Sequence, residues 1–136
     1  MLYEYALTVP LATPASAPTT LEVALSAGTV TQVSVQFPAG CRGLVRVAIY
    51  RSNHQVWPGN LDGYLAAENH VIIWPDDYDL TDRPFSVQLR GWAPATQYPH
   101  TITFRFAVLE LERKREAAGI ASGLRRMAEV LLGRKG

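Results

Sequence analysis

The three histidines are the first side chains in this sequence that suggest metal or acid–base chemistry. His54, His70 and His100 lie in three separate segments, with no H-x-H or H-E-x-x-H spacing. Zinc and related ions are usually bound by ligands with recognisable local spacing, and that spacing is missing here. We therefore expect no metal site, and ordinary hydrogen-bonding roles for the three imidazoles.

Four aspartates, Asp76, Asp77, Asp79 and Asp82, could supply oxygen ligands to Ca²⁺. Their spacing lacks the D-x-[DN]-x-[DN]-G pattern and the terminal glutamate of a calcium loop. Aspartate is also common in turns, because its side chain accepts hydrogen bonds from nearby backbone amides. The sequence favours a turn over residues 75–84 and leaves calcium binding open from Asp76 to Asp82.

Nucleophilic catalysis has no support in the sequence. The single cysteine, Cys41, lies in the turn-like PAGCRG, and no histidine is near it in sequence. There is no G-x-S-x-G elbow and no phosphate-binding G-x-x-x-x-G-K-[ST] loop. We predict no catalytic residue, no cofactor and no enzymatic activity; one cysteine also excludes an intramolecular disulfide.

Aromatic side chains offer a different kind of site. Trp57, Trp92 and Tyr64 could form a platform that stacks on sugar rings, which would make the protein a carbohydrate-binding module. Tryptophan in a small β-domain also serves as core or interface. Both alternatives remain open at the level of sequence.

The elements that position these residues follow from periodicity. Between residues 2 and 109, apolar residues alternate with polar ones in short runs separated by Pro, Gly, Asn and Asp clusters, which is typical of strands. The clearest faces are Tyr3–Tyr5–Leu7–Val9, Val33–Val35–Phe37 and Ile102–Phe104–Phe106–Val108. Turns at intervals of roughly ten residues predict a mainly β protein, an antiparallel β-sandwich or jelly roll of about eight strands.

Two segments extend this predicted domain of residues 1–109. Residues 10–19 (PLATPASAPT) are rich in proline and predict an extended arm or connection. Residues 110–136 predict a basic amphipathic α-helix, because apolar residues recur there at steps of three and four. The stripe, a predicted interface with the same domain or with a neighbouring subunit, consists of Ala117, Ile120, Leu124, Met127 and Leu131.

Charge divides the chain unequally. The formal net charge is +1, and residues 112–136 carry seven basic and three acidic side chains, so the remainder sums to −3. A slightly acidic body disfavours nucleic acid as a partner, because phosphate binding needs a positive surface. No apolar run is long enough to span a membrane, and no targeting segment precedes the first strand, so we expect synthesis in the cytoplasm.

The strand runs of residues 20–109, the segment 10–19 and the stripe from Ala117 to Leu131 together resemble the small β-sandwich virion proteins of tailed bacteriophages and related particles. The resemblance concerns architecture and involves no diagnostic motif. It implies a structural component, such as head decoration, minor capsid or tail protein, that forms a homo-oligomer or docks on other structural proteins. It implies a location in the virion or another large particle, and no catalytic residues.

Overall fold

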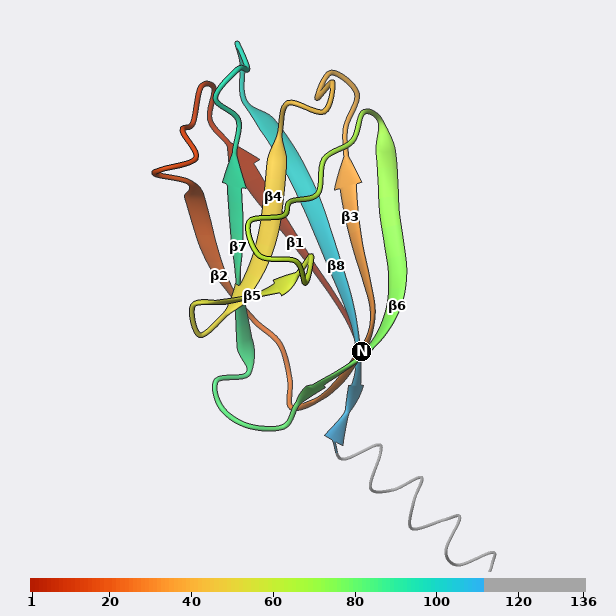
Figure 1. Ribbon diagram of the computed structural model, residues 1–136. Helices are drawn as coiled ribbons and strands as arrows, with labels where there is room; N and C mark the ends of the chain where they lie inside the picture. The colour runs from red at the N-terminus through yellow and green to blue at the C-terminus, as the bar shows by residue number, and fades with distance from the viewer. Residues whose placement is uncertain (112–136) are drawn as a thin grey trace, which may run out of the picture.

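The computed structural model of the protein describes residues 1–111, which form eight β-strands (Figure 1). The predicted helical stripe from Ala117 to Leu131 lies outside the described residues. The strands are β1 (Leu2–Val9), β2 (Thr19–Ala24), β3 (Gly28–Phe37), β4 (Arg46–Arg51), β5 (His54–Trp57), β6 (His70–Leu80), β7 (Ser86–Trp92) and β8 (His100–Glu110).

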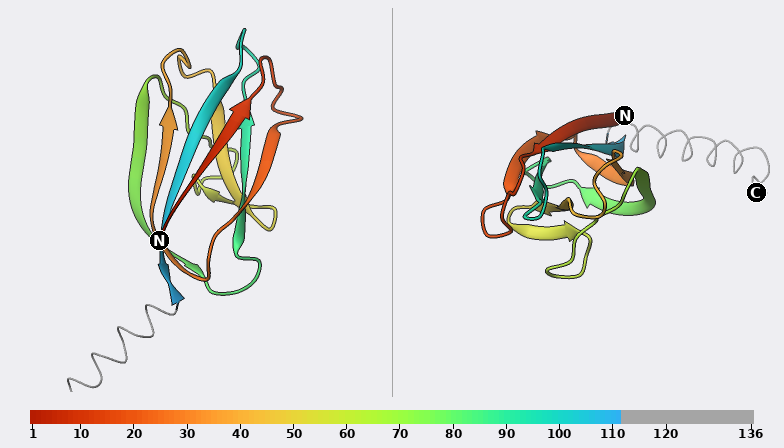
Figure 2. Two further views of the ribbon diagram at one scale, coloured as in Figure 1. Left: turned by 180° about the vertical axis from the view of Figure 1, so that it is seen from behind. Right: turned by 90° about the horizontal axis from the view of Figure 1, so that it is seen from above.

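The strands form two four-stranded sheets, with the orders β1-β8-β3-β6 and β2-β7-β4-β5, and every pairing is antiparallel. The two sheets lie face to face (Figure 2). Consecutive strands lie in different sheets except for β4 and β5, and β8 lies between β1 and β3. This is the strand order of an eight-stranded jelly roll, so the predicted mainly β architecture is confirmed.

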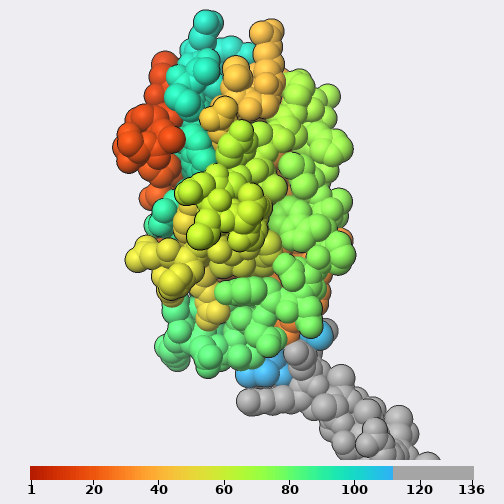
Figure 3. Space-filling view, viewed as in Figure 1, coloured from red at the N-terminus to blue at the C-terminus, as the bar shows by residue number. Residues whose placement is uncertain are grey.

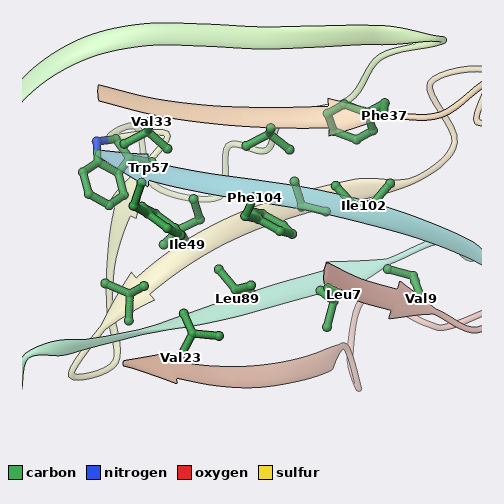
Figure 4. Close-up of a cluster of buried hydrophobic side chains, with 14 of the residues drawn as sticks. Leu7, Val9, Val23, Val33, Phe37, Ile49, Trp57, Leu89, Ile102 and Phe104 are labelled. Atoms are coloured by element: carbon green, nitrogen blue, oxygen red, sulfur yellow. The ribbon is translucent and has the colours of Figure 1, made fainter. Parts of the chain in front are cut away.

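The core between the sheets is built by alternation along each strand. In β8, Ile102, Phe104, Phe106 and Val108 are buried, which confirms the predicted face, while the residues between them point outward. Figure 4 shows aromatic and aliphatic side chains from both sheets meeting in the space between them. The labelled members of this cluster are Leu7, Val9, Val23, Val33, Phe37, Ile49, Trp57, Leu89, Ile102 and Phe104.

A β-bulge in β3 keeps its apolar residues on the inner face. The register of β3 against both neighbours shifts between Val30 and Gln32. Val30 is buried before the shift and Val33 is buried after it, while Thr31 and Gln32 are both exposed. One extra residue at this point reverses the side-chain alternation, so that Val33, Val35 and Phe37 point into the core as predicted.

β6 corrects one prediction. Residues 75–80 belong to this strand, whereas the sequence predicts a turn from residue 75. Proline is tolerated because β6 is an edge strand that, within residues 1–111, pairs with β3 alone, and Pro75 lies opposite Gln32, next to the bulge. The aspartates that favour a turn therefore lie along a strand, where neighbouring side chains point to opposite faces.

Candidate functional site

Two of the three predicted stacking residues come together on the outer face of the β2-β7-β4-β5 sheet. Trp92 ends β7, and Tyr64 belongs to the loop of residues 58–69 between β5 and β6. Their ring centroids are 6.2 Å apart and the ring planes are inclined by 81°, an edge-to-face arrangement. Tyr64 is 45% exposed, so this aromatic pair faces solvent.

Two arginines lie beside the aromatic pair. Arg46 of β4 is opposite Trp92 in the strand register, and its guanidinium carbon is 4.8 Å from the centroid of the Tyr64 ring. Arg90 of β7 lies over the ring of Tyr50, with 3.7 Å between its guanidinium carbon and the ring centroid. Both contacts have the geometry of cation–π interactions, which hold the two guanidinium groups against aromatic faces.

These side chains line a cleft of about 500 Å³, here named the arginine cleft. One wall is the connection before β2, residues 15–18, and the other is the loop of residues 58–69. Figure 3 shows the connection in red-orange at the left and the loop in yellow-green at the centre. The side chains that carry the chemistry of the cleft are Arg46, Tyr50, Asp62, Tyr64, Arg90 and Trp92.

The first wall is fixed to its own domain. The backbone amide of Ala93 donates to the carbonyl of Thr13 at 2.9 Å, and the amide of Ala12 donates to the hydroxyl of Thr96 at 3.2 Å. The proline-rich residues 10–18 therefore form a short connection that lies against the end of β7. They do not extend away from the domain as an arm.

The second wall is held by the amide side chain of Gln55 and by a backbone bridge. Nε2 of Gln55 donates to the carbonyls of Pro58, Asn60 and Gly63, at 2.8, 3.1 and 3.1 Å. Leu65 then forms a two-way backbone bridge to Val47 of β4, at 3.0 and 2.8 Å. These bonds bring the loop, and Tyr64 with it, over the outer face of the sheet.

The third predicted stacking residue, Trp57, is not part of the cleft. Its side chain lies in the core, 5% exposed, in an edge-to-face contact with Tyr78 and near Phe106. The indole Nε1 donates to Oδ2 of Asp76 at 2.6 Å. Trp57 is therefore removed from the set of ligand-stacking residues, because inward-facing positions of β5 belong to the core.

The acidic segment does not gather into a ligand cage. Asp76 accepts the indole N–H, while Asp79 accepts a hydrogen bond from the hydroxyl of Thr29 at 3.4 Å. Among residues 1–111, no group of three or more His, Cys, Asp or Glu side chains is placed to hold a metal ion. The same residues contain no helix of the length and apolar character needed to cross a bilayer.

Cys41 lies in the loop of residues 38–45, between β3 and β4. The Cys41 thiol is buried, and burial raises its pKa, with a further contribution from the charge of Glu68. The Glu68 carboxylate accepts hydrogen bonds from the backbone amides of Arg42 and Gly40, at 2.7 and 3.0 Å. These bonds lower the pKa of Glu68, because they stabilise the charged carboxylate.

The second open surface of the molecule is the edge strand β6. Val71 and Ile73 point outward and are 40% and 57% exposed. They lie beside Gln36 and Ser34 of β3 in the register of the sheet. In β8, on the other side of β3, Arg105 forms an ion pair with Glu4 of β1 at 2.7 Å.

Sequence reasoning missed the two arginines of the cleft. A signal was present, because Arg46 and Tyr50 fall on the outward face of one strand, opposite Val47 and Ile49. The partners of this face, Arg90 and Trp92, lie on β7 and are brought alongside only by strand pairing. Nothing local in the sequence indicates that the loop at Tyr64 closes over them.

Comparison with known proteins adds little to this geometry. No family model matches the chain, and no curated protein matches it. Among solved structures it is similar to one described as "Bacillus endospore appendages form a novel family of disulfide-linked pili", with 13% sequence identity, a TM-score of 0.36, and coverage of 80% of this chain and 88% of that chain. At this level the similarity assigns no function, and it gives no support to a virion origin.

Proposed function

We propose that this jelly roll is a non-enzymatic structural protein that self-associates through the edge of β6. The observation that carries the proposal is the unpaired edge of the N-terminal half of β6, residues 70–74 (HVIIW). β6 bonds to β3 on one side, and among residues 1–111 no strand bonds to its other side. An unpaired edge presents backbone donors and acceptors to a further strand.

Protection of this edge is unequal along its length. From Pro75 onward the strand carries a proline and the carboxylates of Asp76, Asp77 and Asp79, which are devices that oppose pairing with another chain. Residues 71–74 carry no charge, and they include two β-branched isoleucines and a valine, which favour strands. The edge is therefore blocked in one half and open in the other.

The partner that fits this edge is a second copy of the same chain. Antiparallel pairing of one edge with itself satisfies a two-fold axis, so the same surface is used on both subunits. In the same sheet as residues 70–74, Glu4 and Arg105 on neighbouring strands form an ion pair, so these two charges compensate each other. Burial of Val71 and Ile73 in the contact would stabilise it by about 25 cal/mol per Å² of apolar surface.

The interior supports a structural role in preference to catalysis. The space between the sheets is filled by side chains such as Phe37 and Phe104, both fully buried (Figure 4). The jelly roll is a fold used by viral capsid proteins, and with the sequence resemblance this supports a component of a virion or other large particle.

The experiment is a solution mass measurement by light scattering on the full chain and on Ile73→Lys. We expect an oligomer for the wild type and a monomer for the variant, because a lysine at this position charges the open half of the edge. Leu61→Lys is the matched control, since Leu61 is 82% exposed and belongs to the loop of residues 58–69, outside β6.

A wild-type protein that stays monomeric overturns the proposal. An oligomer that survives Ile73→Lys, in a variant with an unchanged circular dichroism spectrum, shows that β6 is not the contact. A chain ending at residue 111 then tests the predicted stripe of Ala117, Ile120, Leu124, Met127 and Leu131 as the alternative interface.

A further inference from the structure

We infer that the arginine cleft binds a carbohydrate ring that carries an anionic group, a carboxylate or a sulfate. This function is separate from assembly, because the cleft lies on the β2-β7-β4-β5 sheet and the open edge belongs to the other sheet.

The first observation behind this inference is that neither cleft arginine has an ion-pair partner within residues 1–111, where the ion pair that forms is Arg105 with Glu4. Arg90 donates Nε to the neutral amide oxygen of Gln88 at 2.6 Å, which leaves its terminal nitrogens without an acceptor in this part of the chain. A guanidinium group presents these donors in a planar fork that matches a carboxylate or sulfate.

The second observation concerns Arg46, whose guanidinium group has an unsatisfied hydrogen-bond donor. Its Nε is buried and has no hydrogen-bond partner in the described structure. A buried donor without an acceptor destabilises the folded state, and the penalty is larger when the group is charged. A bound anion at the terminal nitrogens would offset part of this cost by compensating the charge.

The aromatic and acidic side chains of the cleft suit a sugar ring. The C–H faces of a pyranose pack against aromatic rings, and the exposed Tyr64 with Trp92 provides such a surface. Asp62, the carboxylate that lines the cleft, can accept hydrogen bonds from sugar hydroxyl groups. Two guanidinium groups, aromatic rings and one carboxylate acceptor form the combination that a uronic acid or sulfated sugar requires.

The dimensions and the fixed walls agree with a small ligand. The volume of about 500 Å³ lies within the range of roughly 300–1,000 Å³ that is usual for small-molecule sites. The hydrogen bonds of Gln55 and the bridge from Leu65 to Val47 hold the loop in place before a ligand arrives. A site formed in advance loses less conformational entropy on binding. Nucleic acid fits less well, because two arginines offset by a carboxylate form no continuous track for a phosphate backbone.

The test is titration of the full-length protein with trigalacturonic acid, a sulfated heparin disaccharide and neutral maltotriose, followed by isothermal calorimetry and amide chemical shifts. We expect binding of one or both acidic probes, shifts at Tyr64 and Trp92, and no saturable binding of maltotriose. The two acidic probes distinguish a carboxylate ligand from a sulfate ligand.

The variants Arg46→Gln and Arg90→Gln are each expected to weaken binding of the acidic probe by roughly tenfold, as loss of a charge-assisted hydrogen bond predicts. Tyr64→Ala is expected to weaken it, whereas its control Tyr98→Ala, an exposed tyrosine beside His100 outside the cleft, is expected to leave it unchanged. Arg83→Gln, whose guanidinium lies over Phe85, is the charge control.

Equal binding of maltotriose and the acidic probes would overturn the inference, as would acidic binding that survives both arginine variants. Absence of binding to all three probes at millimolar concentration would also overturn it. Because an arginine variant could alter folding, each is first compared with the wild type in thermal unfolding, and Tyr64→Ala, at an exposed position, provides an independent test of the same cleft.

Discussion

The indole N–H of Trp57 donates to a carboxylate oxygen of Asp76 across 2.6 Å, and this bond links the edge strands of the two sheets. Trp57 lies on β5 and Asp76 on β6. A large aromatic residue can be buried at this corner because its one polar atom has a charged acceptor. The bond also explains why Trp57 belongs to the core and why Asp76 is a structural residue.

Replacement of Asp76 by Ala should therefore destabilise the protein by about 1–3 kcal/mol, because the buried indole N–H would lose its partner. Urea unfolding followed by tryptophan fluorescence measures the change. Asp77→Ala is the control, since Asp77 is held through its backbone amide, which donates to Asp76 at 2.7 Å, and its effect should stay within about 0.5 kcal/mol. Equal losses in the two variants would contradict the role given to this bond.

Gly91 on β7 is a second position with a specific requirement. A Cβ there would come within 2.6 Å of Cγ2 of Val9 and 3.2 Å of Cδ2 of Leu7, so the absence of a side chain allows β1 to approach β7. We expect Gly91→Ala to destabilise the fold by about 1–3 kcal/mol, as extra volume in a packed core does. Thermal unfolding measures the effect.

Gly59→Ala is the matched control for Gly91, because its nearest neighbour would be the Val56 carbonyl at 3.9 Å, an ordinary contact. A small effect is expected there. If Gly91→Ala is as stable as the control, the close approach of β1 and β7 is not restricted by this position.

Glu68 should make the free energy of unfolding depend on pH in the acidic range. Its pKa is lowered in the folded state by the amides of Arg42 and Gly40, so its contribution is present above the pKa of the unfolded chain. The contribution is lost as the pH falls through the lower pKa of the folded protein. Glu68→Gln should therefore be less stable than the wild type at pH 7, and the difference should shrink in acid.

Urea unfolding at neutral and acidic pH measures this difference. Glu22→Gln, whose carboxylate accepts a hydrogen bond from the hydroxyl of Ser86, controls for the loss of one surface charge. A difference between wild type and Glu68→Gln that stays constant with pH would show that the two amide bonds do not favour the ionised carboxylate.

The sequence predicts the inner faces of the long strands well, because alternation is a local property of the chain. Tyr3 to Val9 and Ile102 to Val108 fall on the expected sides, as do Val33, Val35 and Phe37. The strand over residues 75–80 was predicted wrongly, because Pro75 and the aspartates are tolerated only where β6 has a free edge.

The arginine cleft is harder to predict, because its residues come from separate strands and a loop. Trp92 and Arg46 are neighbours through the register of β7 with β4, which depends on the packing of the whole sheet. The position of Tyr64 depends on Gln55 reaching three carbonyls of the following loop. Such pairings between distant residues leave no periodic trace in one sequence.

The place of β8 between β1 and β3 has a consequence for the order in which the chain can fold during translation. β1 is made first, yet its strand partner in the described part of the chain is β8, about a hundred positions later, and pairings at such separation are slow to form. Until the ribosome has released residues 100–110, the β1-β8-β3-β6 sheet lacks a central strand. The nascent jelly roll therefore cannot complete its fold before then, and its apolar strands stay exposed. Chaperone binding would protect the chain most during this period.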